Sequence, residues 1–336
     1  MPKFLIVRFS SIGDIVLTTP VVRCLKKQVP DAEVHYVTKK SFGHILENNP
    51  YISKIFTIEK DVSEIAGVLR DEQYDFIVDL HHNLRSSILK QKLGVKSGSF
   101  PKLNVKKFLL TKFKIDRLPE LHVVDRYFAA VKSWGVNPDM NPCDYFIPPH
   151  DEVSTTQFGL SEKFIAFAIG AQLGTKKLPN EKIISIIQKI KMPVAILGGK
   201  TDFENGEQIA AACPNAVNLC GKMNLNQSAS IIRQCEKMVT HDTGLMHIAS
   251  CFKKKIISVW GNTVPAFGMY PYSPMDPHLY SIHEVKGLAC RPCSKIGYPT
   301  CPKKHFNCMQ QQNIDAIVKC VNQGCGDLVT GNVKAI

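Results

Sequence analysis

Two rounds of alternating strands and helices dominate this chain of 336 residues. Each round consists of short apolar runs, each followed by a loop and then by apolar residues at helical spacing. The first round predicts strands at Phe4–Phe9, Glu33–Val37, Ile55–Ile58 and Phe76–Leu80, and a last helix over Val123–Trp134. Because strands that alternate with helices form parallel sheets covered on both faces, the sequence predicts an α/β fold.

A proline-rich stretch separates the two rounds. Residues Asn137–His150 contain four prolines and few periodic apolar positions, which is typical of a linker. The second round predicts strands at Phe164–Ile169, Val194–Leu197, Ala216–Leu219, Met238–Thr240 and Ile256–Trp260. We therefore expect two domains, residues 1–150 and 151–336, and the last helix could pack back on the first domain. Open α/β sheets bind ligands at the carboxyl ends of their strands, so we expect a cleft between the two sheets.

Charge and composition narrow the environment and the partners. The formal net charge of +13 favours an anionic partner, which could be nucleic acid, an anionic membrane face or a phosphorylated substrate. The apolar runs are strand-sized and no secretory signal follows Met1, so we expect a cytoplasmic protein. In a reducing cytosol the 12 cysteines are expected to be mostly core thiols.

Two loops that follow predicted strands carry candidate chemistry. The first, Ser10-Ser11-Ile12-Gly13-Asp14, opens a helix with a tight turn. Its Asp14 is either an ordinary helix cap or a general base. The second, residues 170–179, offers glycines, the Thr175 hydroxyl and the ammonium groups of Lys176 and Lys177. These groups suit a diphosphate, although a solvated basic loop would have the same composition.

A third loop follows the strand that ends at Thr240. It places Asp242, Thr243, Gly244 and Leu245 at a helix start, where free backbone N–H groups can bind phosphate. His247 follows in the first turns, either as a buried structural residue or as part of the site. Neither the spacing of a P-loop nor that of a dinucleotide fingerprint occurs in these loops, which counts against a dehydrogenase.

These three loops, in this order and spacing, resemble those of the heptosyltransferase family, glycosyltransferase family 9. The likeness is carried by Arg8–Asp14 with Thr19-Pro20, by Lys176–Pro179, and by Asp242–Leu245 with His247, and it runs over nearly the whole chain. The resemblance implies a GT-B fold, in which two Rossmann-like domains have parallel sheets that face a central cleft. It also implies that the N-terminal domain binds an acceptor and the C-terminal domain a nucleotide sugar.

The resemblance further implies an inverting transfer of heptose from an ADP-sugar to a hydroxyl of a lipopolysaccharide core, with no cofactor required for catalysis. It makes Asp14 the catalytic base and Ser10, Ser11 and Gly13 its acceptor-side loop. Donor phosphates are assigned to Thr175 and Lys176, and the donor loop to Asp242, Thr243, Gly244, Leu245 and His247. Two positions depart from the family: Leu178 stands where tryptophan is often found, and Gly199–Asp202 lacks a counterpart to an acidic residue near the ribose.

A basic segment, residues 102–117, interleaves lysines with apolar residues. It could be a solvated amphipathic face, or it could contact an anionic, lipid-linked acceptor at the cytoplasmic face of the inner membrane, with Lys106 and Lys107 near that acceptor.

The cysteines Cys290, Cys293, Cys301 and Cys308 form a further group with Pro and Gly between them. A Cys-x-x-Cys pair with two more thiols could hold a structural zinc, or the four could be reduced thiols that pack a loop. Cys320 and Cys325 are not expected to join them.

Two other functions remain open at this stage. A sugar-nucleotide epimerase of the same architecture would act without an acceptor. A nucleic-acid-binding protein would use the positive charge and a zinc knuckle. That second alternative leaves the Asp14 loop and the Asp242–His247 loop unexplained, so we expect no nucleic-acid partner.

Overall fold

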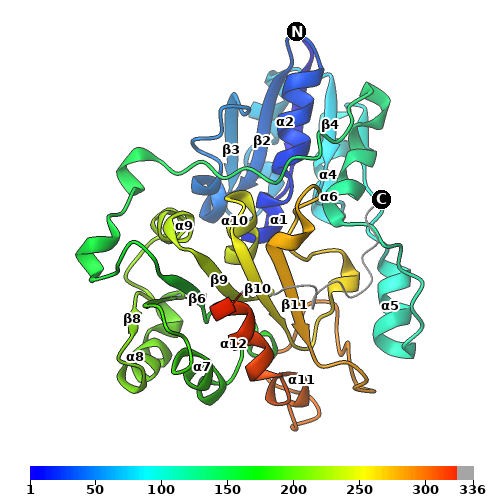
Figure 1. Cartoon of the computed structure of the whole chain (residues 1–336). Coiled ribbons are helices and arrows are strands. Elements are labelled where there is room, and N and C mark those ends of the chain that lie inside the picture. Colours follow the sequence, from blue (N-terminus) through cyan, green and yellow to red (C-terminus); the bar gives the residue numbers. More distant parts are fainter. Residues whose placement is uncertain (324–336) are drawn as a thin grey trace. The chain divides into compact units, whose positions relative to one another are not determined.

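The computed structural model describes residues 1–323, which form two compact units (Figure 1). The first unit comprises Met1–Lys102 and Leu121–Pro148, and the second comprises Leu103–Glu120 and the chain from Pro149 onward. The segment 103–120 lies within the range of the predicted first domain, residues 1–150. In the structure, however, it belongs to the second unit. Lys114 holds it there, donating hydrogen bonds to the carbonyl oxygens of Cys290 at 3.2 Å and Pro292 at 2.8 Å.

The first unit is built on a parallel sheet of five strands in the order β3-β2-β1-β4-β5. The strands are β1 (Lys3–Val7), β2 (Glu33–Lys39), β3 (Lys54–Ile58), β4 (Phe76–Asp79) and β5 (Ser97–Ser99). The helices of this unit are α1 (Ile12–Val16), α2 (Thr19–Gln28), α3 (Ala66–Asp71), α4 (Leu84–Leu93) and α6 (Val123–Tyr127). The helix predicted over Val123–Trp134 is α6 followed by a 3-10 helix over Phe128–Trp134.

The second unit is built on a parallel sheet of six strands in the order β11-β10-β9-β6-β7-β8. The strands are β6 (Ile165–Ala168), β7 (Val194–Leu197), β8 (Ala216–Asn218), β9 (Lys237–His241), β10 (Lys255–Trp260) and β11 (Tyr280–Glu284). The helices are α5 (Asn104–Phe113), α7 (Asn180–Ile187), α8 (Phe203–Ala212), α9 (Leu225–Gln234), α10 (Gly244–Cys251), α11 (Asn307–Gln310) and α12 (Ile314–Gln323).

Both faces of the second sheet are buried, as the near-continuous apolar runs of its strands require. Along β6, Ile165 and Phe167 belong to one core cluster, whereas Ala166 and Ala168 belong to the cluster on the opposite face. Successive side chains of a strand point to opposite faces, so this division follows directly from the strand geometry. The prediction of an α/β fold with parallel sheets is confirmed.

The last helix described, α12, packs within its own unit. Its residues Ile317, Cys320 and Val321 are buried in the core cluster that contains the apolar side chains of α7. Its apolar stripe is thus covered by side chains of the second unit. Cys325 lies outside the described residues. No helix among residues 1–323 is long and apolar enough to span a membrane.

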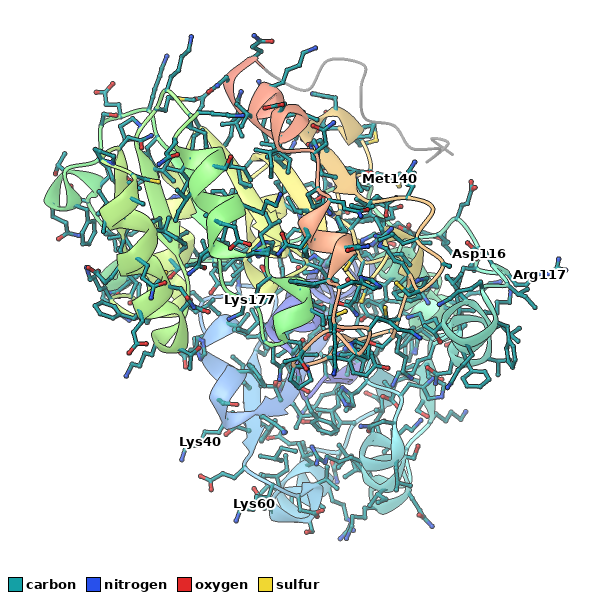
Figure 2. The ribbon with its side chains drawn as sticks, turned by 90° about the horizontal axis from the view of Figure 1, so that it is seen from below. Lys40, Lys60, Asp116, Arg117, Met140 and Lys177 are labelled. Atoms are coloured by element: carbon teal, nitrogen blue, oxygen red, sulfur yellow. The ribbon has the colours of Figure 1, made fainter. Side chains whose placement is uncertain are left out.

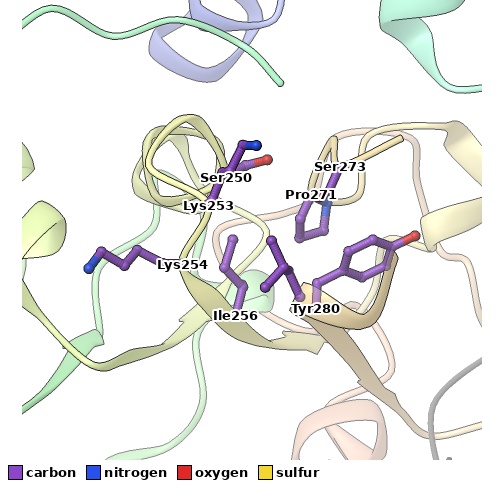
Figure 3. A pocket seen from close by; sticks show the side chains of 8 residues that line it. Ser250, Lys253, Lys254, Ile256, Pro271, Ser273 and Tyr280 are labelled. Atoms are coloured by element: carbon purple, nitrogen blue, oxygen red, sulfur yellow. The ribbon is translucent and has the colours of Figure 1, made fainter. Parts of the chain in front are cut away.

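A small pocket of the second unit lies away from the edge where ligands of such sheets bind. Its empty volume is about 160 Å³ (Figure 3). Ile256 and Tyr280, which stand at the amino ends of β10 and β11, line it together with Ser250 and Lys253. The Ser250 hydroxyl already donates to the carbonyl oxygen of Tyr272 at 2.6 Å. The pocket therefore belongs to the packing beneath α10, and the site has to be sought at the carboxyl edge.

Candidate functional site

Asp14 lies at the point where the strand order of the first sheet reverses. β1 pairs with β2 on one side and with β4 on the other, and the chain leaves β1 directly into the loop Arg8–Ser11 and helix α1. The chain continues from β1 to β2 on one side of the sheet and from β4 to β5 on the other side. Because the two connections diverge, a crevice forms at the carboxyl ends of β1 and β4, which is the usual ligand position of doubly wound sheets. Ser10, Ser11 and Gly13 occupy the same loop and the start of the same helix.

The Asp14 carboxylate is held by three donors. Arg8 Nη2 lies 2.5 Å from its Oδ1, while the Ser11 backbone N–H and hydroxyl donate to its Oδ2 at 3.1 and 2.7 Å. The side chain remains 21% exposed, so solvent or a ligand can still reach it. A neighbouring cation and two donors favour the carboxylate anion, which is the form that a general base needs.

Arg8 contacts the Asp14 carboxylate in the candidate site, although sequence reasoning gives this arginine no role of its own. It is buried, and it donates through Nη1 to the carbonyl oxygen of Leu80 at 2.6 Å and through Nε to that of Ser10 at 2.8 Å. Burial alone would lower the pKa of its guanidinium, but the Asp14 carboxylate, together with Tyr127 and Tyr36, raises the pKa overall. A cation at the end of an apolar strand, just before the Ser10 loop, was the available sequence signal.

In the second unit, three neighbouring strands bring the other candidates together. The order β10-β9-β6-β7 places the reversal between β9 and β6. The loop after β6 carries Lys176, the residue after β9 is Asp242, and the loop after β10 contains Thr263. All of these strands are parallel, so the three loops meet at one edge of the sheet.

Lys176, Asp242 and Thr263 contact one another at this edge. Lys176 Nζ lies 2.6 Å from Asp242 Oδ2, and the Thr263 hydroxyl donates to the same oxygen at 3.0 Å. The side chains of Lys176 and Asp242 are 18% and 13% exposed. Since an ammonium group has three donor hydrogens, Lys176 can bind an anion while it keeps its carboxylate partner. The sequence offered no signal for Thr263, because its role depends on the pairing of β9 with β10.

The helix that follows Asp242 supplies backbone donors. Thr243 is the N-cap of α10, and the residues Asp242–Leu245 are half-buried, whereas the flanking His241 and Met246 are fully buried. The first N–H groups of a helix lack partners within it and carry the positive end of its dipole, so this start suits a phosphate. His247 is only 3% exposed in the core of the unit. Its part in donor binding stays a prediction.

Thr175 and Lys177 have structural partners. The Thr175 hydroxyl is buried, donates to the carbonyl oxygen of Tyr298 at 3.0 Å and accepts from its N–H at 2.8 Å. A hydroxyl has one hydrogen to donate, so Thr175 has none left for a phosphate and instead fixes the loop. Lys177 Nζ lies 2.6 Å from Asp202 Oδ1 (Figure 2 labels Lys177). Asp202 therefore balances the charge of Lys177 in this loop.

His241 lies under the same loop as a neutral ring. Its Nε2 accepts the backbone N–H of Leu178 at 3.0 Å, so the ring proton is on Nδ1. Burial, and then the nearby Lys177, lower the pKa of His241 to about 3. Leu178, which replaces the tryptophan often found in the family, is itself buried above this ring.

Acid should therefore destabilise the protein through His241. Its folded pKa is lowered, so its stabilising effect is present above the ordinary pKa of 6.5 and is lost as the pH falls from there toward 3. Between about pH 7 and about pH 5.5, urea unfolding should show the free energy of unfolding of the wild type falling by about 1 kcal/mol more than that of His241→Gln. Equal losses in the two proteins would mean that His241 does not titrate in this way.

The predicted acceptor lysines of α5 have unequal surroundings. Lys106 is exposed, but Lys107 is half-buried, with its ammonium 5.8 Å from the centre of the Phe267 ring. Asp116 and Arg117 project from the chain just beyond this helix (Figure 2). Lys106 is thus available to a partner, while Lys107 helps to attach α5 to the second unit.

The four cysteines lie near one another, but they do not form a preformed metal site. The pKa of Cys293 is raised to about 11, first by burial and then by its neighbour Cys290. Cys290 Sγ is 3.8 Å from His305 Nε2. Among residues 1–323, however, no group of three or more His, Cys, Asp or Glu side chains is arranged to hold a metal ion.

Two α/β units, each built on a parallel sheet, are the architecture of GT-B glycosyltransferases. The chain belongs to glycosyltransferase family 9 (heptosyltransferase), whose sequence profile matches residues 62–296. The predicted family and enzyme class are thereby confirmed: the protein is a glycosyltransferase. Heptosyltransferases of this kind generally need no cofactor for catalysis.

Individual relatives agree with this assignment. The lipooligosaccharide heptosyltransferase 2 of Haemophilus influenzae is 25% identical over 293 residues, which cover 79% of this chain and 85% of the relative. The structure of E. coli ADP-heptose lps heptosyltransferase II matches with a TM-score of 0.69 at 20% identity, covering 94% of this chain and 98% of that one. E. coli heptosyltransferase WaaC with ADP matches with a TM-score of 0.64 at 18% identity, covering 83% and 92%. These two structures confirm the predicted fold.

Proposed function

We propose that this protein transfers a heptose, or a related sugar, from an ADP-sugar to a hydroxyl group of a lipopolysaccharide-core acceptor, with inversion at the anomeric carbon. The observation that carries the donor side is the contact of Lys176 with Asp242 at the start of α10, where a cation and helix N–H groups converge at the reversal point of the sheet. The donors and acceptors named for the relatives supply the chemical class of both substrates.

The proposed reaction is a single displacement. The acceptor oxygen attacks the anomeric carbon, its proton passes to a carboxylate oxygen of Asp14, and the bond between the sugar and the phosphate breaks with its electron pair going to ADP. Lys176 and the N–H groups of α10 stabilise the charge that grows on the diphosphate. Because no covalent intermediate forms, the configuration inverts once. Asp14 afterwards releases the proton to solvent.

A nucleotide panel tests the donor class. A ligand that binds only the folded protein raises its thermal midpoint, so ADP and ADP-sugars should stabilise the purified protein. UDP, GDP and CDP should do so much less. A preference for UDP, GDP or CDP would contradict the proposed donor and keep the transferase, whereas an absence of stabilisation by every nucleotide would contradict the donor site itself.

We also propose that the protein works in the cytoplasm and touches the inner membrane through its basic segment. Residues 102–117 contain six basic residues against one acidic residue. Four of its apolar side chains point into solvent, with exposed fractions of 72% for Val105, 52% for Phe108, 61% for Phe113 and 47% for Ile115. Exposed aromatic and aliphatic groups among lysines are the composition of a surface that binds anionic lipid.

Charge reversal at Lys106 and Lys112 tests this membrane contact. Each lysine near an anionic surface contributes about 1 kcal/mol, so Lys106→Glu with Lys112→Glu should weaken binding to anionic phospholipid vesicles about 30-fold or more. Activity should fall on vesicle-embedded acceptor and stay unchanged on delipidated acceptor. The matched control is Lys163→Glu with Lys191→Glu, two exposed lysines of the second unit that lie outside the basic segment. Equal losses on both forms of acceptor would argue against a membrane role.

The spacing of the four cysteines, and the contacts of Cys290 with Cys293 and His305, support a further proposal of a structural zinc. The thiols would have to move closer together to bind it, since they are not arranged as ligands now. Metal analysis of protein purified without chelators should find about one zinc per chain. Its absence would leave the four cysteines as loop-packing thiols.

A further inference from the structure

The segment that carries the cysteines, residues 285–313, contacts the loops of the donor site. It follows β11 and reaches α11, and its backbone and side chains contact both the loop after β6 and the loop after β10. The family assignment gives no role to these contacts. They make residues 285–313, hereafter the cysteine-rich segment, a structural support for the edge of the sheet where Lys176 and Asp242 meet.

Arg291 makes the contact with the loop after β10. Its Nε donates to the carbonyl oxygen of Gly261 at 2.6 Å and its Nη2 to that of Thr263 at 2.8 Å. The side chain is 7% exposed, and Glu284 at the end of β11 balances its charge at 2.6 Å. The planar guanidinium holds its donors in a fixed geometry toward the two carbonyl groups, whereas a lysine ammonium on its flexible stem does not fix their relative positions. Arg291 therefore sets the course of the backbone from Gly261 to Thr263.

That backbone course determines where the Thr263 hydroxyl lies. The hydroxyl donates to Asp242 Oδ2 at 3.0 Å, and the same oxygen is 2.6 Å from Lys176 Nζ. A continuous chain of polar contacts thus runs from Arg291 through Thr263 and Asp242 to Lys176. Arg291 itself has no contact with Lys176, so any effect of Arg291 on a ligand of Lys176 has to pass through these intermediates.

A second contact reaches the loop of Lys176 directly. Thr175, the residue before Lys176, exchanges hydrogen bonds with the backbone of Tyr298, including Thr175 N–H to Tyr298 O at 3.1 Å. Gly174 lies so close to the cysteine-rich segment that a Cβ there would be 2.2 Å from the carbonyl oxygen of Pro299. The cysteine-rich segment therefore contacts both the loop after β6, which carries Lys176, and the loop after β10, which carries Thr263.

We propose that the cysteine-rich segment positions the donor site and that Arg291 is its positioning residue, acting through Thr263 and Asp242 on Lys176. This inference rests on the proposed binding of an ADP-sugar by Lys176. It assigns the segment a part in donor affinity, whether or not its thiols bind metal. Arg291 is not a catalytic residue, because its contacts are with backbone carbonyl groups and Glu284.

A double-mutant cycle with ADP as the probe tests this coupling. Arg291→Lys keeps the charge beside Glu284 but replaces the rigid planar fork by a flexible ammonium group, so it should weaken ADP binding about tenfold in calorimetry. In a Lys176→Ala background the same change should weaken ADP binding less than about twofold, because the contact through which it acts is gone. Thr263→Val, which removes only the shared hydroxyl, should reproduce the loss caused by Arg291→Lys.

The control is Arg233→Lys on α9, whose ion pair with Glu152 at 2.6 Å is exposed on the same unit and should leave ADP binding unchanged. Thermal unfolding of each variant shows whether the fold is kept, and Arg291→Lys rather than Arg291→Ala avoids an unpaired Glu284. Equal losses from Arg291→Lys in both backgrounds would overturn the inference, since a general structural effect is additive. Failure of the wild type to bind ADP would overturn the proposed function, and this inference with it.

Discussion

Asp14→Asn should lower the turnover number by about 10²–10⁴-fold, because a positioned general base contributes that much to proton transfer. The amide keeps the size of the carboxylate and can still accept the Ser11 N–H, but it cannot take a proton from the acceptor hydroxyl. ADP affinity should stay unchanged, since the residues proposed to bind the donor are in the second unit. Steady-state kinetics with saturating donor and acceptor, together with calorimetry for ADP, measure both quantities.

Glu64 provides a matched control for Asp14. Its carboxylate has the same local role at the start of another turn, where it accepts the backbone N–H of Asp61 at 2.7 Å in the first unit. Glu64→Gln should therefore keep nearly full turnover. If Asp14→Asn retained wild-type turnover, Asp14 would not be the base. If it lost ADP binding as well, the loss of turnover would have to be sought in the fold of the protein instead of the proton transfer.

Lys176→Ala should lower kcat/KM for the donor by about 10²–10³-fold, which is the usual loss when one group that stabilises a developing negative charge is removed. Two effects contribute, because the ammonium would bind the diphosphate in the ground state and stabilise its growing charge as the sugar leaves. The Asp242 carboxylate, left without its cation, would also repel the diphosphate. Initial rates at varied donor concentration separate the KM part from the kcat part.

Lys177 is an unusually close control, because it is the adjacent lysine and has an aspartate partner at the same distance. Lys176 pairs with Asp242 at 2.6 Å and Lys177 with Asp202 at 2.6 Å. Lys177→Ala should therefore change kcat/KM less than about tenfold, since it removes a loop contact and not a proposed donor contact. Similar losses from the two variants would mean that the positive charge of the loop matters, and not the position of Lys176.

Local patterns were sufficient to predict most of the fold. Continuous apolar runs predict buried strands at Phe164–Ile169 and Val194–Leu197, and the structure has β6 and β7 within these two ranges. The edge strands β5 (Ser97–Ser99) and β11 (Tyr280–Glu284) were missed because they are short and partly polar. In β5 a glycine is required for close packing, as a Cβ on Gly98 would lie 2.0 Å from the carbonyl oxygen of Ala130.

The residues of the candidate site also fall into two groups, those that could be predicted from the sequence and those that could not. Asp14, Lys176 and Asp242 could be predicted because each lies in the loop or helix start that comes after a strand, and the carboxyl ends of parallel strands are where ligands bind. Arg8, Thr263 and Arg291 could not be assigned, since their roles depend on contacts between distant parts of the chain. The carbonyl oxygen that Arg8 Nη1 binds belongs to Leu80, 72 residues away. Likewise, the burial of Thr175 by Tyr298 could not be inferred from the loop sequence.

The central claim is tested most directly by a transfer reaction with purified protein, an ADP-heptose donor and a lipopolysaccharide-core acceptor that lacks the heptose to be added. Mass spectrometry of the acceptor should show the gain of one heptosyl residue, and NMR of the product should show the anomeric configuration opposite to that of the donor. Release of ADP without any change in the acceptor, or conversion of the sugar nucleotide with no acceptor present, would contradict the account.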